Sequence, residues 1–322
     1  MTPVTPVGTV AHSGHPPSSE SSRSGLPGHH LGRARRQEMV EGLALVAPSL
    51  LGIAVFLVVP IAVVIWLSVN SWDLIGPMRF VGLRNWFAVL SDPTFGHSLW
   101  ITLVFVVLVV PVQVALGLAM ALLLTRGLPG SGVFRVLYVI PWMCAPLALG
   151  VVWQWIFAPS GGALNALTGA QTDWLNSPVL ALPIVALVTI WSQVGYTTLF
   201  FMAGLAGIPV SVLEAAQIDG ASSWQSLWRI RIPLLGPTLY FVALTGAISA
   251  FQAFDQIYAL TPSGGPGSRT NVMALRIYQE AFQGGFNLGH ASVMALVLFV
   301  IIVAVTLVQH RFIAGRITYD LS

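Results

Sequence analysis

Six apolar segments dominate the sequence, and each is long enough to cross a lipid bilayer. The hydrocarbon core is about 30 Å thick, which takes about 20 helical residues. The segments lie at 43–69, 99–125, 135–157, 179–206, 237–260 and 291–314. Inside a bilayer every backbone polar group needs a partner within the protein, and a helix supplies one to each. The sequence therefore predicts an all-α membrane protein with six transmembrane helices, within a transmembrane domain over residues 37–322.

Charged residues are scarce, and every basic side chain is an arginine. Of the 322 residues, 56% are hydrophobic and 8% are charged, whereas a soluble domain carries about 25% charged residues. All 14 of these basic residues are arginines, and the sequence contains no lysine. Because a phosphate-binding P-loop and a Schiff-base enzyme both need a lysine, the chain contains neither. We predict no catalytic residues, no metal site and no cofactor in this chain, and no dense basic patch indicates a nucleic acid.

The arginines also predict how the chain is oriented. Residues 1–36 are rich in Ser, Pro, Gly and His without an apolar pattern, which indicates a disordered tail. With this tail inside, ten arginines fall in cytoplasmic segments and four in outer loops. Cytoplasmic loops of membrane proteins carry the excess of basic residues. We therefore expect a multi-pass protein of the cytoplasmic membrane, with both termini and residues 207–236 in the cytoplasm.

The segment 209–233 is the longest polar-decorated stretch between two apolar ones, and it reads as two short helices. Ser211 and Glu214 have the Ser-x-x-Glu spacing of a capping box, which predicts the start of the first helix. Gly220 lies where that helix should stop, in a left-handed conformation that glycine adopts at little cost. We expect Asp219 to cap a helix or to pair with Arg229 or Arg231.

The second helix is predicted by the same rules. Ser222 and Gln225 repeat the capping box as Ser-x-x-Gln. Trp224 and Trp228 fall on one helix face, and Pro233 is expected to end the helix. Such a helix–turn–helix with an aromatic face is suited either to docking against another protein or to lying on the lipid surface.

The spacing of seven positions in this loop resembles the EAA motif of ABC importer permeases. The family pattern is Glu-Ala-Ala, three residues, Gly, nine residues and Ile-x-Leu-Pro. It is matched here by Glu214, Ala215, Ala216, Gly220, Ile230, Ile232 and Pro233. The only departure is Ile232 in place of Leu, a swap that conserves volume.

Two of the predicted spans carry polar and aromatic side chains that suit a sugar, whose hydroxyls take hydrogen bonds and whose C–H face stacks on aromatic rings. These candidates for the substrate pathway are Trp191, Gln193 and Tyr196 in the fourth span and Gln252, Asp255 and Tyr258 in the fifth. Polar residues of this kind also hold transmembrane helices together, so contacts between helices are the alternative. An ionisable Asp255 within a span would face a cavity or a partner.

Residues 254–266 resemble a second stretch, Phe-Asp-x-Ile-Tyr-x-Leu-Thr-x-Gly-Gly-Pro, found in sugar-importer permeases, with one residue inserted before Gly-Gly-Pro. The chain thus resembles the carbohydrate-type permeases of binding-protein-dependent ABC importers, the maltose and glycerol-phosphate group. That resemblance implies the ABC importer permease fold and ATP-driven, alternating-access transport of a sugar or sugar-like solute. Oligosaccharides, monosaccharides and glycerol phosphate are the solutes it implies.

The resemblance also implies partners. Such a permease pairs with a second, homologous permease in a heterodimer, surrounded by membrane lipid. Two ATPase subunits bind ATP and Mg, and an extracytoplasmic solute-binding protein delivers the solute. The residues implied in coupling to the ATPase are Glu214, Ala215, Ala216, Asp219, Gly220, Ile230 and Pro233.

Two other functions remain open from the residues alone. A permease of the same class could carry a non-sugar solute such as an amino acid, a peptide or phosphate. An ion-coupled secondary transporter would place carboxylates or histidines in several spans, and here only Asp255 qualifies.

Overall fold

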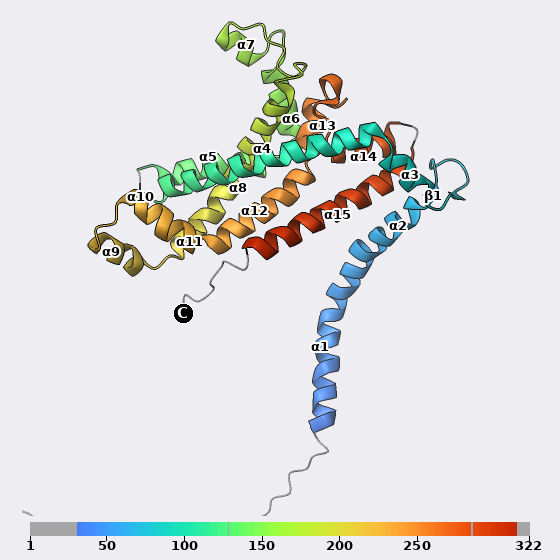
Figure 1. Cartoon of the computed structure of the whole chain (residues 1–322). Helices are drawn as coiled ribbons and strands as arrows, with labels where there is room; N and C mark the ends of the chain where they lie inside the picture. Colours follow the sequence, from blue (N-terminus) through green and yellow to red (C-terminus); the bar gives the residue numbers. More distant parts are fainter. Residues whose placement is uncertain (1–30, 128, 285, 314–322) are drawn as a thin grey trace, which may run out of the picture. The chain divides into compact units, whose positions relative to one another are not determined.

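The computed structural model describes residues 31–127, 129–284 and 286–313, mostly as helices (Figure 1). The chain divides into two units, residues 1–59 and 60–322. The described part contains four helices long and apolar enough to span a membrane, or up to six if each of two bent helix pairs counts as one span. The predicted all-α membrane architecture is therefore confirmed, and one two-stranded ladder, β1 (Asn70–Ser71) with β2 (Arg79–Phe80), accompanies it.

The first unit holds the beginning of the first apolar segment. Its described part consists of α1 (Leu31–Ile53) and the π-helical stretch η1 (Ala54–Val58). The helix continues into α2 (Val59–Ser68), and residues 41–68 form a 28-residue candidate span. Because α1 begins at Leu31, the last six residues of the predicted tail are helical; they are mostly Leu, Ala and Arg, which are good helix formers. Residues 1–30 of that tail lie outside the described residues.

The second unit contains the remaining helices. The long ones are α4 (Pro93–Leu124), α5 (Ser131–Met143), α6 (Pro146–Ile156), α8 (Ala181–Ala206), α12 (Gly236–Phe251) and α15 (Leu288–Ile313). The short ones are α3 (Arg84–Leu90), α7 (Ala163–Thr168), α9 (Val210–Ile218), α10 (Ser223–Ser226), η2 (Leu227–Arg231), α11 (Ile232–Leu234), α13 (Asp255–Leu260), η3 (Pro266–Ser268) and α14 (Met273–Phe282).

The parallel pair α4 and α8 forms the centre of this unit. Their N-terminal halves share one buried cluster that includes Phe105 and Val185, and their C-terminal halves share another that includes Ala121 and Phe201. The helix α12 runs the opposite way, because its Val242 joins the second cluster and its Ala250 the first. The helices α4, α8, α12 and α15 thus run between two ends of the unit, while α6 and α7 project away from them (Figure 1). One end carries α9–α11 (the α9 end), and the other carries α3, α13 and α14 (the α14 end) (Figure 1).

Two predicted spans are broken rather than continuous. The third, predicted over 135–157, consists of α5 and α6, which meet at an angle of 100°. Ala145 takes an extended conformation there because it precedes Pro146, whose ring disfavours the helical region for its neighbour. The fifth, predicted over 237–260, ends at Phe251, and Asp255 begins the separate helix α13. A carboxylate in the first turn favours the start of a helix, so Asp255 stabilises this second start.

Close contacts between α4, α5 and α8 depend on glycine. A Cβ on Gly117 of α4 would collide with the Thr197 side chain of α8. The same Thr197 hydroxyl accepts a 2.8 Å hydrogen bond from Gln113 Nε2, and both side chains are buried. On α8, a Cβ on Gly195 would collide with the backbone carbonyl of Tyr138 in α5. Small residues at such positions let helix backbones approach closely within a membrane.

We predict that Gly195→Ala destabilises the protein by about 1–3 kcal/mol, because the added methyl group meets backbone atoms rather than a movable side chain. The measurement is the thermal unfolding midpoint of the purified chain. Gly132→Ala is the matched control, since a Cβ at Gly132 of α5 meets nothing within 4 Å. Equal midpoints for the two variants would contradict the close packing of α5 on α8.

Candidate functional site

The turn after α9 is a Schellman motif built on Gly220. Gly220 has φ +78°, the left-handed conformation that the sequence predicts. Its N–H donates to the Gln217 carbonyl at 3.0 Å, and the N–H of Ala221 donates to the Ala216 carbonyl at 2.9 Å. These two bonds satisfy carbonyls that a helix end otherwise leaves free. The turn therefore has one defined geometry, and a residue with a Cβ is strained at Gly220.

The helix that follows begins with the predicted capping box. Ser222 Oγ accepts from the Gln225 N–H at 3.3 Å, and Gln225 Oε1 accepts from the Ser222 N–H at 2.9 Å. Pro233 does not end this helix, contrary to prediction. The N–H of Ile232 bonds five residues back to Leu227, forming the π-helical stretch η2, and the helix runs on to Leu234. It then bends by 70° into α12.

One further local prediction is wrong, and another holds in one of its two alternatives. Ser211 does not cap α9, because the helix already begins at Val210 and Pro209 occupies the capping position without a side-chain bond. Asp219 occupies the C-cap position of α9, where its backbone N–H bonds to the Ala215 carbonyl, so of its two predicted roles the capping position is the one found. Among the described residues, Asp219 forms no ion pair within 4.0 Å with Arg229 or with Arg231. Glu214 and Asp219 are thus both free to contact another molecule.

An exposed surface covers this turn, and we call it the loop surface: Glu214, Ala215, Ile218, Trp224 and Trp228. Ile218 is 86% exposed, and the indoles of Trp224 and Trp228 are 68% and 53% exposed. The two rings meet edge to face, with centroids 5.5 Å apart. Ala216 is buried, Ile230 is half-buried and Pro233 is exposed. Aromatic anchors of this kind dominate the binding energy of protein interfaces.

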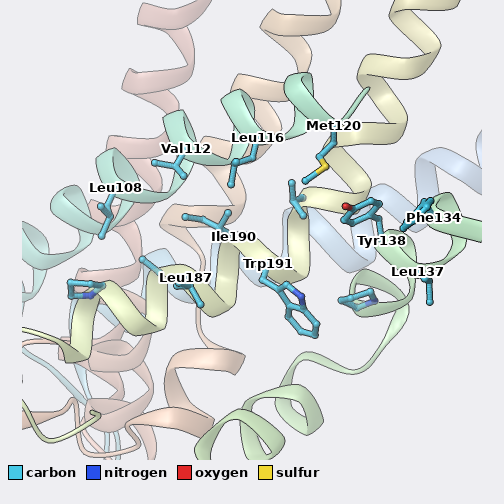
Figure 2. Close-up of a pocket in the computed structure, with 14 residues that line it drawn as sticks. Leu108, Val112, Leu116, Met120, Phe134, Leu137, Tyr138, Leu187, Ile190 and Trp191 are labelled. Atoms are coloured by element: carbon cyan, nitrogen blue, oxygen red, sulfur yellow. The ribbon is translucent and has the colours of Figure 1, made fainter. Parts of the chain in front are cut away.

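A second feature is an apolar cavity of about 740 Å³ between α4, α5 and α8 (Figure 2). Leu108, Val112, Leu116 and Met120 line it from α4, Phe134, Leu137 and Tyr138 from α5, and Leu187, Ile190 and Trp191 from α8. Trp191 is the only predicted pathway residue in this lining. The cavity unites the consecutive helices α4 and α5 with the more distant α8, and no local motif indicates it.

The other predicted pathway residues lie in two further places. Tyr196 stacks on Trp142 of α5 with ring centroids 5.0 Å apart and also packs on Phe200 at 4.7 Å, while Gln193 is half-buried on α8. These rings form an aromatic strip along α8.

The second place is the α14 end. Gln252 and Asp255 are exposed there. Tyr258 stacks on Phe254 at 5.3 Å and meets Tyr278 of α14 edge to face at 5.3 Å. The sequence had predicted that Asp255 lies within a continuous span. This prediction is wrong, because Asp255 begins the separate helix α13. The six candidates are divided between the α8 face and the α14 end, and the structure does not bring them together around one cavity.

An ionic cluster at the α14 end was not predicted. Arg276 Nη2 lies 3.3 Å from Glu280 Oε2 and 3.7 Å from Asp92 Oδ2, and His290 Nδ1 lies 3.4 Å from Glu280 Oε1. The bond to His290 and the charge of Arg276 hold the pKa of the Glu280 carboxyl below its usual range, although burial opposes them. Burial raises the pKa of Asp92, but bonds from Thr94 and the charge of Arg276 outweigh it, and the net pKa is lowered. One part of this cluster could have been predicted from the sequence: Arg276 and Glu280 are four residues apart on an amphipathic helix, the spacing of an ion pair.

Spanning helices around a parallel pair, with a helical turn exposed at one end, define a multi-pass membrane protein. Residues 113–319 match the family described as "Binding-protein-dependent transport system inner membrane component". The chain belongs to this family, whose members are transport components rather than catalysts. The resemblance drawn from the two motifs is thereby confirmed.

Relatives and solved structures agree with this assignment. The sn-glycerol-3-phosphate transport system permease protein UgpA of Agrobacterium fabrum is 36% identical over 280 residues, covering 85% of this chain and 95% of the relative. The trehalose/maltose transport system permease protein MalF of Thermococcus litoralis is 32% identical over 293 residues, covering 89% and 98%. A chain of the bacterial alginate ABC transporter, crystallised with an alginate pentasaccharide-bound periplasmic protein, superposes with a TM-score of 0.75 at 18% identity. That match covers 88% of this chain and 96% of the transporter chain, and it shows the shared fold.

We predict that acid weakens the α14 end. The pKa values of Asp92 and Glu280 are lowered in the folded state, so their stabilisation is present above their unfolded pKa values and is lost as the pH falls through the folded ones. The thermal unfolding midpoint should therefore drop once the pH falls below about 4. Glu280→Gln should lower the midpoint at pH 7 by about 2–4 °C and flatten its acid dependence. The control is Asp173→Asn, which alters a carboxylate outside this cluster; the same flattening in both variants would contradict the assignment.

Proposed function

We propose that this chain is the permease subunit of an ATP-driven ABC importer that moves a sugar or sugar-like solute across the cytoplasmic membrane by alternating access. The observation that carries the proposal is the loop surface: a rigid, exposed turn at one end of the spanning helices, in the register of the EAA motif. The solute class is supported by relatives named for sn-glycerol-3-phosphate and for trehalose and maltose, and by the fold shared with an alginate transporter chain.

The loop surface is the proposed contact with an ATPase subunit. Glu214 supplies an exposed charge, Ala215 leaves the α9 face small, and the Trp224–Trp228 pair supplies an apolar anchor. A helix laid into a groove is a common mode of protein recognition. Since the chain has no lysine for a P-loop, ATP and Mg belong to separate ATPase subunits. Closure of two such subunits would draw two loop surfaces together and tilt the spans, as in rigid-body transitions.

The proposed orientation follows from the arginines and the two ends. The ten-to-four division of arginines supports a cytoplasmic location for both termini and residues 207–236. The α14 end then faces outward and meets an extracytoplasmic solute-binding protein. The second permease subunit, in a heterodimer, completes the pathway together with the aromatic strip and Trp191 of α8.

We predict that Gly220→Ala lowers solute uptake by the assembled importer several-fold while leaving the chain folded. A Cβ there has open space around it but is strained by the left-handed conformation, which costs about 1 kcal/mol and shifts the turn. Uptake of labelled solute into proteoliposomes with ATP inside is the measurement. Gly82→Ala is the matched control, because Gly82 is also left-handed, also has open space, and lies outside the loop surface. Normal uptake in Gly220→Ala would overturn the coupling role.

We further predict that Trp224→Ala strongly reduces co-purification of the ATPase subunit, because truncating an aromatic hot spot of an interface costs about 2 kcal/mol or more, about a thirtyfold loss of affinity. The measurement is a pull-down of the tagged chain in mild detergent, with both ATPase and second permease quantified. Trp155→Ala serves as the control, since this tryptophan is also exposed, at 63%, but lies on α6. Retention of the second permease with loss of the ATPase supports the proposal; equal ATPase recovery in both variants contradicts it.

A further inference from the structure

The short helix α3 has an apolar face that no other part of the described chain covers. Leu83, Phe87 and Leu90 are 59%, 69% and 56% exposed. Their spacing of four and then three residues places them on one side of the helix. Single exposed apolar residues are common on protein surfaces, whereas several that lie together mark a contact with another molecule or with a membrane. These three side chains, the α3 face, therefore belong against a partner.

The remaining sides of α3 show how the helix is oriented. Asn85 and Val89 are buried, and Val89 joins a cluster with residues of α4, α14 and α15, so this side packs against the protein. Arg84 and Ala88 are exposed on another side. At 100° per residue, the α3 face lies between the buried side and this polar edge. A helix with an apolar side next to a polar one is suited to the boundary between lipid and water.

Asn85 fixes α3 at the level where two candidate spans end (Figure 1). Its Nδ2 donates to the carbonyl of Ser68, the last residue of α2, at 3.0 Å and to the carbonyl of Asn70 at 2.9 Å. A Cβ on Gly289, in the first turn of α15, would collide with the same Asn70 carbonyl and with Asn85 itself.

The length of the last span sets the depth of this junction. The span Leu288–Phe312 has 25 residues and is therefore about 38 Å long. The hydrocarbon core of a bilayer is about 30 Å thick, and the bilayer with its headgroups about 40–45 Å. When this span crosses a bilayer, its first turn lies in the headgroup layer, and α3 lies there with it.

We propose that the α3 face rests on the phospholipid bilayer, with its three side chains at the edge of the acyl chains and Arg84 among the headgroup phosphates. The face is continuous with span ends that lipid already surrounds. On α4, Trp100 is 62% exposed and Val107 71%, and tryptophan is enriched at the membrane–water boundary. The contact is independent of any transported solute; only its assignment to the outer leaflet rests on the proposed function.

The test is the depth of spin labels on the full chain in nanodiscs of phosphatidylcholine and phosphatidylglycerol, measured by power-saturation EPR with oxygen and with a water-soluble nickel chelate. The exposed Cys144 is first replaced by serine. Phe87→Cys and Leu90→Cys then carry labels on the α3 face. Ala88→Cys is the matched control, because Ala88 is exposed on the same helix but on its polar edge. Since oxygen concentrates in the acyl region and the chelate stays in water, the oxygen-to-nickel collision ratio should be about threefold higher at the two face positions.

Two results would overturn the proposal. Equal ratios at all three labels would show that water covers the α3 face. Low accessibility to both reagents at Phe87 and Leu90 would show that protein covers it, whether a second copy of this chain or, in the assembled importer, another subunit. The thermal midpoint shows whether each labelled variant is folded, and either face position alone decides the question. Because no ATP, solute or ATPase enters the measurement, its outcome stands apart from the uptake and pull-down assays that test the proposed function.

Discussion

The structure depends first on the need of every backbone polar group in a bilayer for a partner within the protein. Continuous helices meet that need, so α4 and α8 stay unbroken through the centre, held together where Gly117 meets Thr197 and where Gln113 bonds to the same hydroxyl. Two of the spans are broken. The middle of α6 packs on α13, since a Cβ on Gly150 would collide with Ala259. The break between α5 and α6, at residues 143–146, is exposed among the described residues.

Hydrophobicity predicted where the spans lie but not whether each is straight. The apolar content of 135–157 is the same for one helix or for two that meet at 100°, and only Pro146 and its extended neighbour distinguish them. Asp255 carried a comparable signal, because an acidic residue favours a helix start, whereas a position within the span would have it face a cavity or a partner. The Ser-x-x-Glu pattern at Ser211 was misleading because a capping box needs the serine outside the helix, and α9 begins one residue before it.

The loop surface was predictable because its geometry is local. The Schellman turn at Gly220 and the capping box at Ser222 each join residues within a few positions of one another, and such spacings can be read from a sequence. The apolar cavity and the ionic cluster were not predictable for the opposite reason. Asp92 and Arg276 are far apart in the sequence, and the folding of the intervening helices brings their side chains within 3.7 Å.

The local bonds also decide where a displacement of the loop would be absorbed. At Gly220 and Ser222 the free backbone groups of both helix ends are paired, so the turn between α9 and α10 moves as a unit. Beyond this turn the backbone hydrogen bonding is less regular. In η2 the backbone N–H groups bond to carbonyls five residues earlier, and Pro233 has no N–H to donate. The chain then bends by 70° after Leu234. A force on Trp224 or Trp228 therefore reaches residues 227–235 first, and these are joined directly to α12. The helix α8 is less free to respond, because Gly195 and Thr197 fix it to α5 and α4. The bend before α12, rather than the core pair, is the part of the molecule suited to change when the loop is pushed.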